Sequence, residues 1–261
     1  MNVAKPQGTI YVGNAGPIPV FVHWSAVFMV FLAFRGGDDL SVGVAVLLAL
    51  VVGIVLHEFG HGFTALVFKA RNISVTLWAI GGVCASERDR EARPWAEVAI
   101  LVAGPAVSFA LAGLSYVLGW VLAGAMPDLL VEGGQLAAFL AQGGDPKQVT
   151  GLLRDNYPMI SLSELSMWGV TLTMMFWVNL SLGIFNCLPI FPLDGGQIAY
   201  QVQRGCGVRH NTAAIGGRGL AVAGGAGGLG FAYWYFGSVS TFNLIFVAIL
   251  VVMSFQYLRV R

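Results

Sequence analysis

The feature that most constrains this chain is an H-E-x-x-H pattern inside a long apolar run. The run begins at Ser41 and carries no charged residue before Glu58. His57 and His61 are four residues apart, so on a helix they lie about 40° apart around the axis and can bind one ion. Glu58 follows the first histidine and can reach a water beside that ion. The pattern is typical of a zinc site with a glutamate general base.

The apolar setting strengthens this interpretation. Burying a carboxylate and two imidazoles in an apolar helix is unfavourable by several kcal/mol unless something pairs with them. A metal ion supplies that pairing. The alternative is a hydrogen-bonded histidine pair beside an unrelated glutamate at a helix end.

The composition indicates a membrane protein. Of the 261 residues, 57% are hydrophobic and 10% are charged, whereas soluble domains have about 25% charged residues. The net charge of +1 gives no reason to expect a nucleic-acid partner. Three scattered cysteines do not form a disulfide framework. The N-terminus does not have the pattern of a cleavable signal peptide, so the first apolar run is expected to remain in the mature protein.

We predict an all-α polytopic membrane protein with six transmembrane helices, in a single domain over residues 1–261. A helix needs about 20 apolar residues to cross the bilayer core. The last forty uncharged residues are long enough for two crossings, divided at residues 237–240. The predicted spans are residues 18–34, 41–68, 98–125, 165–188, 219–236 and 241–258.

Basic residues decide the orientation of such a protein, because cytosolic loops are enriched in them. With both termini inside, only Arg35, Lys147 and Arg154 are external. The eleven cytosolic ones are Lys5, Lys69, Arg71, Arg88, Arg90, Arg93, Arg204, Arg209, Arg218, Arg259 and Arg261. The HEFGH segment then lies near the cytosolic face of what we take to be a prokaryotic cytoplasmic membrane.

Two connections between the spans are unusual. Residues 72–85 are too apolar for a solvated loop and too short to cross as a helix. They predict a short strand or hairpin dipping into the membrane, where open backbone is tolerated beside a cavity or a partner strand. The alternative is an interfacial turn packed on the third span. Residues 126–163 predict an external loop with a short amphipathic helix near 132–140.

Catalytic zinc usually has three protein ligands, so a third one is expected beyond the two histidines. Acidic candidates are Glu87 and Glu91 in a charged, solvated run, and Glu97 at the start of the third span. The favoured candidate is Asp194, which follows two prolines that must break the fourth span. A broken helix with an acid at membrane depth suits a buried cation site. Glu97 is the second choice.

Three motifs together resemble the site-2 protease family of intramembrane zinc metalloproteases. They are HEFGH at residues 57–61, A-G-P at 103–105 and N-x-x-P-x-x-P-L-D-G-G at 186–196. The N-terminal GPIPVFVHW and the later IGGVC are similar to the family's first span entry and its membrane-dipping β region. The resemblance covers nearly the whole chain, in a minimal form without the PDZ or CBS domains of many members.

The resemblance implies that His57, His61 and Asp194 bind one Zn²⁺ ion and that Glu58 is the catalytic acid and base. It also implies that Asn186 helps hold substrate, with Asn179 as a further candidate.

Two departures from the family pattern lie outside the metal set. Ser108 stands where many members have asparagine, and Gln197 stands where arginine is frequent.

The strand containing Gly81 and Gly82 is expected to offer an edge to which an unwound substrate segment adds. The predicted function is therefore hydrolysis of a peptide bond in or near the transmembrane segment of a single-span membrane protein, as in regulated intramembrane proteolysis.

Two other functions compete with this prediction. One is a metal-binding membrane protein or ion transporter, because intramembrane histidines and acids also mark ion pathways. Only hydrolysis requires Glu58, which favours the protease. The other is an inactive relative that binds membrane partners, and the intact motifs speak against it.

Overall fold

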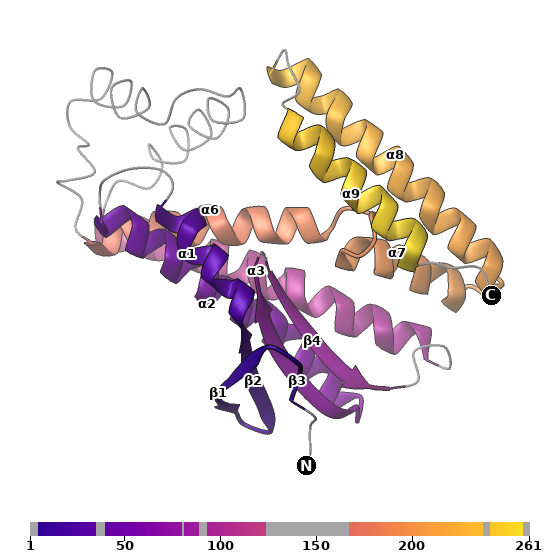
Figure 1. The fold of residues 1–261 in the computed structure, drawn as a ribbon, viewed down its shortest axis with the longest axis horizontal. Coiled ribbons are helices and arrows are strands. Elements are labelled where there is room, and N and C mark those ends of the chain that lie inside the picture. Colours follow the sequence, from indigo (N-terminus) through magenta and orange to yellow (C-terminus); the bar gives the residue numbers. More distant parts are fainter. Residues whose placement is uncertain are drawn as a thin grey trace.

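A computed structural model describes residues 5–34, 40–79, 81–88, 93–123, 167–236 and 241–257. Helices make up most of it, and a small sheet packs against one end of the central helices (Figure 1). The predicted external loop at 126–163, with its helix near 132–140, lies outside the described residues.

Three long helices form the centre of the molecule. They are α2 (Leu40–Val67), α3 (Pro94–Ala123) and α6 (Met167–Asn186), and each packs against the other two. Within the described residues, these three are the helices long and apolar enough to cross a membrane. They correspond to the second, third and fourth predicted spans, and they identify an integral membrane protein.

The first predicted span is wrong over its N-terminal part. Residues Ile18–His23 form a strand, β2, and a short 3₁₀ turn, Trp24–Ala26, leads into helix α1 at Val27–Phe34. Pro19 has no N–H to donate, and the β-branched Val20 and Val22 favour extended backbone. Hydropathy does not distinguish such a strand from the first turns of an apolar helix.

Among the described residues, the sheet has four strands in the order β1-β2-β3-β4. The predicted hairpin at 72–85 is confirmed as β3 (Arg71–Trp78) and β4 (Gly81–Glu87). Strand β1 (Thr9–Ala15) pairs antiparallel with β2, which in turn pairs in parallel with β3. The fold is therefore not purely helical, because the N-terminal segment adds two strands to the hairpin.

The sheet packs on the half of α2 that carries the histidines. Ile18, Ile73 and Val75 from the strands form a buried cluster with Ala65 of α2 and Ile100 of α3. Burial of these apolar side chains stabilises the sheet against the helices by about 25 cal/mol for each Å² removed from water. The cluster holds the sheet next to residues 57–61 of α2, the HEFGH segment.

The C-terminal part contains α7 (Asp194–Gly205), α8 (His210–Phe236) and α9 (Thr241–Tyr257). Helices α8 and α9 run side by side, and α8 also contacts α7 (Figure 1). The predicted division of the last apolar stretch agrees with these bounds. The count of six spans stays a prediction.

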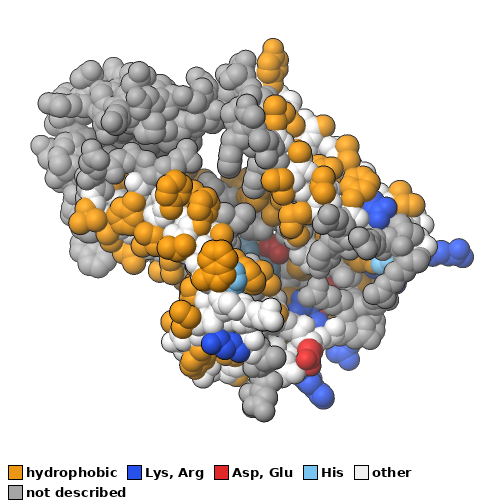
Figure 2. Space-filling view, viewed as in Figure 1, with side chains coloured by type: hydrophobic (Ala, Val, Ile, Leu, Met, Phe, Trp, Pro, Cys, Tyr) orange, Lys and Arg blue, Asp and Glu red, His pale blue; other side chains and the backbone are white. Residues whose placement is uncertain are grey.

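The surface separates apolar from basic side chains. In Figure 2, apolar side chains cover α1 and the outer sides of α8 and α9, whereas Lys and Arg gather at the lower and right-hand sides of the view. A surface of this kind suits a protein whose helices face lipid and whose basic ends face water.

Candidate metal centre

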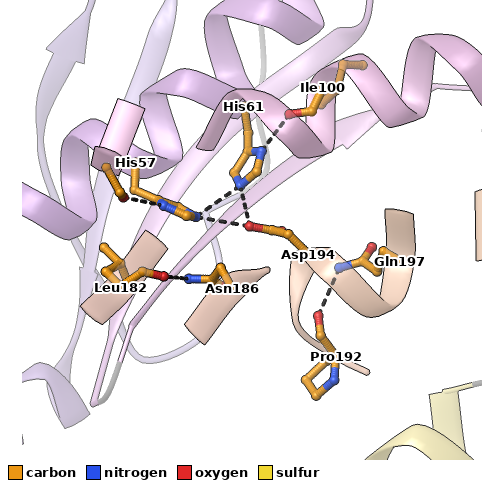
Figure 3. A network of polar contacts seen from close by, with 9 residues as sticks. His57, His61, Ile100, Leu182, Asn186, Pro192, Asp194 and Gln197 are labelled. Atoms are coloured by element: carbon orange, nitrogen blue, oxygen red, sulfur yellow. Dashed lines mark hydrogen bonds and ion pairs between the residues drawn. The ribbon is translucent and has the colours of Figure 1, made fainter. Parts of the chain in front are cut away.

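Helix α2 holds the two histidines on one face. They are four residues apart, and their Nε2 atoms lie 3.2 Å from each other. His57 is 3% exposed and His61 is 6% exposed, so neither ring is solvated by bulk water. Figure 3 shows both rings directed toward the same point, between α2 and the start of α7.

The other nitrogen of each ring is bonded to α3. The Nδ1 of His61 lies 2.7 Å from the Ile100 carbonyl oxygen, and the Nδ1 of His57 lies 2.9 Å from the Ser108 hydroxyl. A carbonyl oxygen only accepts, so Nδ1 of His61 carries the proton and a neutral ring has its lone pair on Nε2. Such partners orient an imidazole for binding a metal.

Asp194 reaches the same point from the first turn of α7. Its Oδ2 lies 3.1 Å from Nε2 of His57 and 3.2 Å from Nε2 of His61. Asp194 is 8% exposed and is the first residue of the helix that follows the prolines. Because α6 ends at Asn186 and α7 begins at Asp194, the carboxylate of Asp194 lies at the same depth as the histidines.

The three residues fit a divalent cation. Their ligand atoms all lie within 4.8 Å of one another. Ligand atoms that converge in this way can bind one divalent cation together, and two imidazoles with one carboxylate match a catalytic zinc set with an open position. The absence of a side chain at Gly104 keeps this space free, because a Cβ there would lie 2.7 Å from Nε2 of His57.

Glu58 lies beside this group and against strand β4. It is 7% exposed. The backbone N–H of Cys84 donates a hydrogen bond to its carboxylate. The space that a Cβ at Gly82 would take is filled by the Glu58 side chain. The strand therefore holds the carboxylate in position, and the same strand forms one edge of the sheet.

Comparison with known families agrees with this geometry. The profile of Peptidase family M50 matches residues 45–215, which include His57, Glu58, His61 and Asp194. The chain belongs to peptidase family M50.

Named relatives of this M50 peptidase are metalloproteases. It is 30% identical to the zinc metalloprotease MJ0392 of Methanocaldococcus jannaschii, over 69% of this chain and 41% of that protein. It is 27% identical to sll0528 of Synechocystis sp., whose name also describes a zinc metalloprotease, over 74% of this chain and 43% of that protein. The chain thus spans about two fifths of the length of these relatives.

A solved structure shares the fold. The site-2 protease from Methanocaldococcus jannaschii superposes with a TM-score of 0.57 at 19% sequence identity. The match covers 97% of this chain and 96% of that one. The M50 peptidase described here therefore has the site-2 protease fold.

Two of the other three acidic candidates for a metal ligand have partners elsewhere. Glu97, which is 3% exposed in the first turn of α3, forms an ion pair with Arg88. Glu87 accepts a hydrogen bond from the Asn72 side chain, and Glu91 lies outside the described residues. Within the described part of the chain, the grouping of His, Cys, Asp and Glu suited to a metal is the one with Asp194.

The residues predicted to bind substrate differ in their solvent exposure. Asn186, at the end of α6, is partly buried and donates to the Leu182 carbonyl of its own helix (Figure 3). Asn179 is fully buried, and its amide oxygen lies where a Cβ at Gly53 of α2 would be. Asn179 therefore packs from α6 against α2. Gly81 begins β4 with open space around it.

Sequence reasoning missed the part that α3 has in the site. Ile100, Gly104 and Ser108 are spaced by four residues, so they share one helix face, and all three face the histidines. Ser108 was noted only as a departure from the family pattern. The four-residue spacing around A-G-P was the available signal.

Proposed function

We propose that this chain is an intramembrane zinc metalloprotease that hydrolyses a peptide bond in or near the transmembrane segment of a single-span membrane protein. The observation that carries the proposal is the position of Glu58 next to the His57, His61 and Asp194 group. Membership of family M50 and the metalloprotease names of its relatives support the same activity.

The roles of the residues follow from their positions. His57, His61 and Asp194 would hold the ion, which would supply Lewis-acid chemistry: polarisation of the scissile carbonyl and a water acidic enough to lose a proton near neutral pH. Glu58 accepts that proton and delivers it to the leaving amine. The Cys84 N–H keeps the Glu58 carboxylate oriented during both transfers. The buried site excludes bulk water, which strengthens the electrostatic interactions inside it.

The substrate is proposed to bind along β4. Peptide bonds in a transmembrane helix are shielded by their hydrogen bonds, so a segment must unwind before it is cut. Strand β4 is the last strand of the sheet and contacts Glu58 through Gly82 and Cys84. An unwound segment that adds to this edge as a strand would pass the catalytic carboxylate. Asn186, close to Asp194 in the chain, and Asn179 are proposed to assist in holding it.

The placement in the membrane is also part of the proposal. Six spans in one domain of residues 1–261, with both termini and the site toward the cytosol, agree with the distribution of basic residues in the sequence. A prokaryotic cytoplasmic membrane is the expected location.

Removal of zinc tests the activity. The purified chain, reconstituted in vesicles with a single-span substrate, is expected to cleave it, and a strong chelator is expected to abolish cleavage. Adding back zinc should restore it, because the ligands remain folded around the site. Product is measured by gel and mass spectrometry. Cleavage that continues at full rate after bound zinc has been removed would rule out the proposed mechanism.

The stability of the substrate helix should control the rate. A substrate with glycine or proline near the cytosolic end of its span is expected to be cut about 10-fold faster than one with leucine and alanine there. Gly is less favourable than Ala by about 1 kcal/mol and Pro by about 3 kcal/mol within a helix. The matched control places the same residues near the opposite end of the span. Equal rates for all substrates would contradict binding as an unwound strand.

A further inference from the structure

The segment that carries Asp194 is tied to the last helix of the chain. Between α6 and α7 the backbone is irregular, and Phe191 lies three residues before Asp194. The carbonyl of Phe191 accepts a hydrogen bond of 2.8 Å from the hydroxyl of Ser254, on α9. Ser254 is completely buried, and Phe191 is 1% exposed. A polar link in this interior is protected from competing water.

Ser254 makes this contact in addition to the hydrogen bond that is usual for a serine in a helix. Serine within an apolar helix commonly bonds the carbonyl one turn earlier, and Ser254 does lie 3.0 Å from the Leu250 carbonyl. The Phe191 carbonyl is nearer, at 2.8 Å, and belongs to a different element. The hydroxyl therefore connects α9 to the segment before α7.

Apolar packing reinforces this connection. Ile190 is 2% exposed and forms a buried cluster with Ala221 of α8 and Leu250 of α9. Phe191 packs with Ala214, near the start of α8. Helices α8 and α9 thus contact both Ile190 and Phe191. Figure 1 shows the α8–α9 pair next to α7, and α8 contacts α7.

The segment is in turn packed against the first turn of α7. A Cβ at Gly196 would lie 2.5 Å from the Phe191 nitrogen, so these backbones are in direct contact. The side chain of Gln197 also donates to the Pro192 carbonyl, at 2.9 Å (Figure 3). A shift of Phe191 must therefore move the turn that begins with Asp194.

We propose that Ser254 is a positioning residue for the metal centre, acting through Phe191 on Asp194. The inference rests on the proposed metal site. The Ser254 hydroxyl holds the segment in the arrangement in which Asp194 reaches both histidines. Without it, the segment spends part of its time in other arrangements. Apparent metal affinity falls by the fraction of the population that is no longer competent to bind.

The test is a zinc titration of the full chain in detergent micelles against a competing chelator. Ser254→Ala is expected to bind zinc about 3- to 10-fold more weakly than the unmodified chain, the size expected from one buried hydrogen bond. Saturating zinc should return cleavage close to the unmodified rate, because no group that contacts substrate has been changed. The visible spectrum of the cobalt-loaded protein reports whether Asp194 still coordinates.

The matched control is Ser115→Ala, which removes another buried hydroxyl, on α3. Thermal unfolding of both variants separates loss of stability from loss of metal affinity. Ser254→Cys keeps the shape with a weaker donor and provides the same comparison if Ser254→Ala does not fold. Unchanged zinc affinity in the folded Ser254 variants, or an equal loss in Ser115→Ala, would overturn the inference. If the unmodified chain binds no zinc, the proposed function itself fails.

Discussion

Replacing Glu58 by glutamine is expected to lower peptide-bond cleavage by about 10²- to 10⁴-fold while leaving bound zinc in place. Glutamine has nearly the shape of glutamate, but its amide cannot accept the proton from the attacking water. The three ligand residues are unchanged, and the ligand group does not include Glu58. Cleavage of a reconstituted substrate and zinc content by mass spectrometry are measured on the same preparation.

The control for this variant is Glu87→Gln, at the end of β4. Glu87 is exposed and bonds Asn72, so it should keep both zinc and cleavage. The comparison also separates a protease from an ion transporter, since a transporter would keep its ion flux when Glu58 is changed. Full cleavage by the Glu58→Gln protein would remove Glu58 from the proposed mechanism.

The second large effect is expected from Asp194→Ala. This change removes one of three ligands and leaves the two Nε2 atoms of the histidines facing each other at 3.2 Å. Loss of an outer partner of a metal ligand weakens binding by about 10- to 100-fold, so loss of a ligand itself should exceed about 100-fold. Zinc affinity is measured by chelator competition on folded protein, and cleavage is expected to disappear with the metal.

Glu97→Gln provides the matched comparison, because Glu97 was the other candidate for the third ligand. The structure pairs it with Arg88. This variant should lose some stability and keep its zinc affinity. The opposite outcome, with zinc lost in Glu97→Gln and retained in Asp194→Ala, would assign the third ligand to the start of α3.

The parts of the fold that were predictable have strong local signals. The uncharged run from Ser41 predicted α2, and the two prolines before Asp194 predicted the break that turns α6 into α7. The site followed from the same signals, because a helix spacing fixes the histidines and a broken helix allows an acid at their depth. Hydropathy and the positions of prolines are read from neighbouring residues, so a single sequence was enough to predict both the helices and the site.

The sheet was harder to predict because half of it depends on distant pairing. Strand β2 is apolar and runs directly into an apolar helix, so by hydropathy it looks like the start of a span. Its partner β3 is about fifty residues further along, as the pairing of Val20 with Val75 shows. No residue in or near β2 indicates that it pairs with β3. The partners of the histidine rings on α3 are also distant from α2 in the chain, and the signal that could have indicated them was the four-residue spacing of Ile100, Gly104 and Ser108.

The absence of a side chain at Gly104 has a consequence for related proteins. A single methyl group at this position would occupy the space between the two imidazoles that the ion needs. A relative can therefore keep every ligand and the glutamate and still be unable to load metal. When catalytically dead members of the family are sought, this glycine is as informative as the ligands themselves.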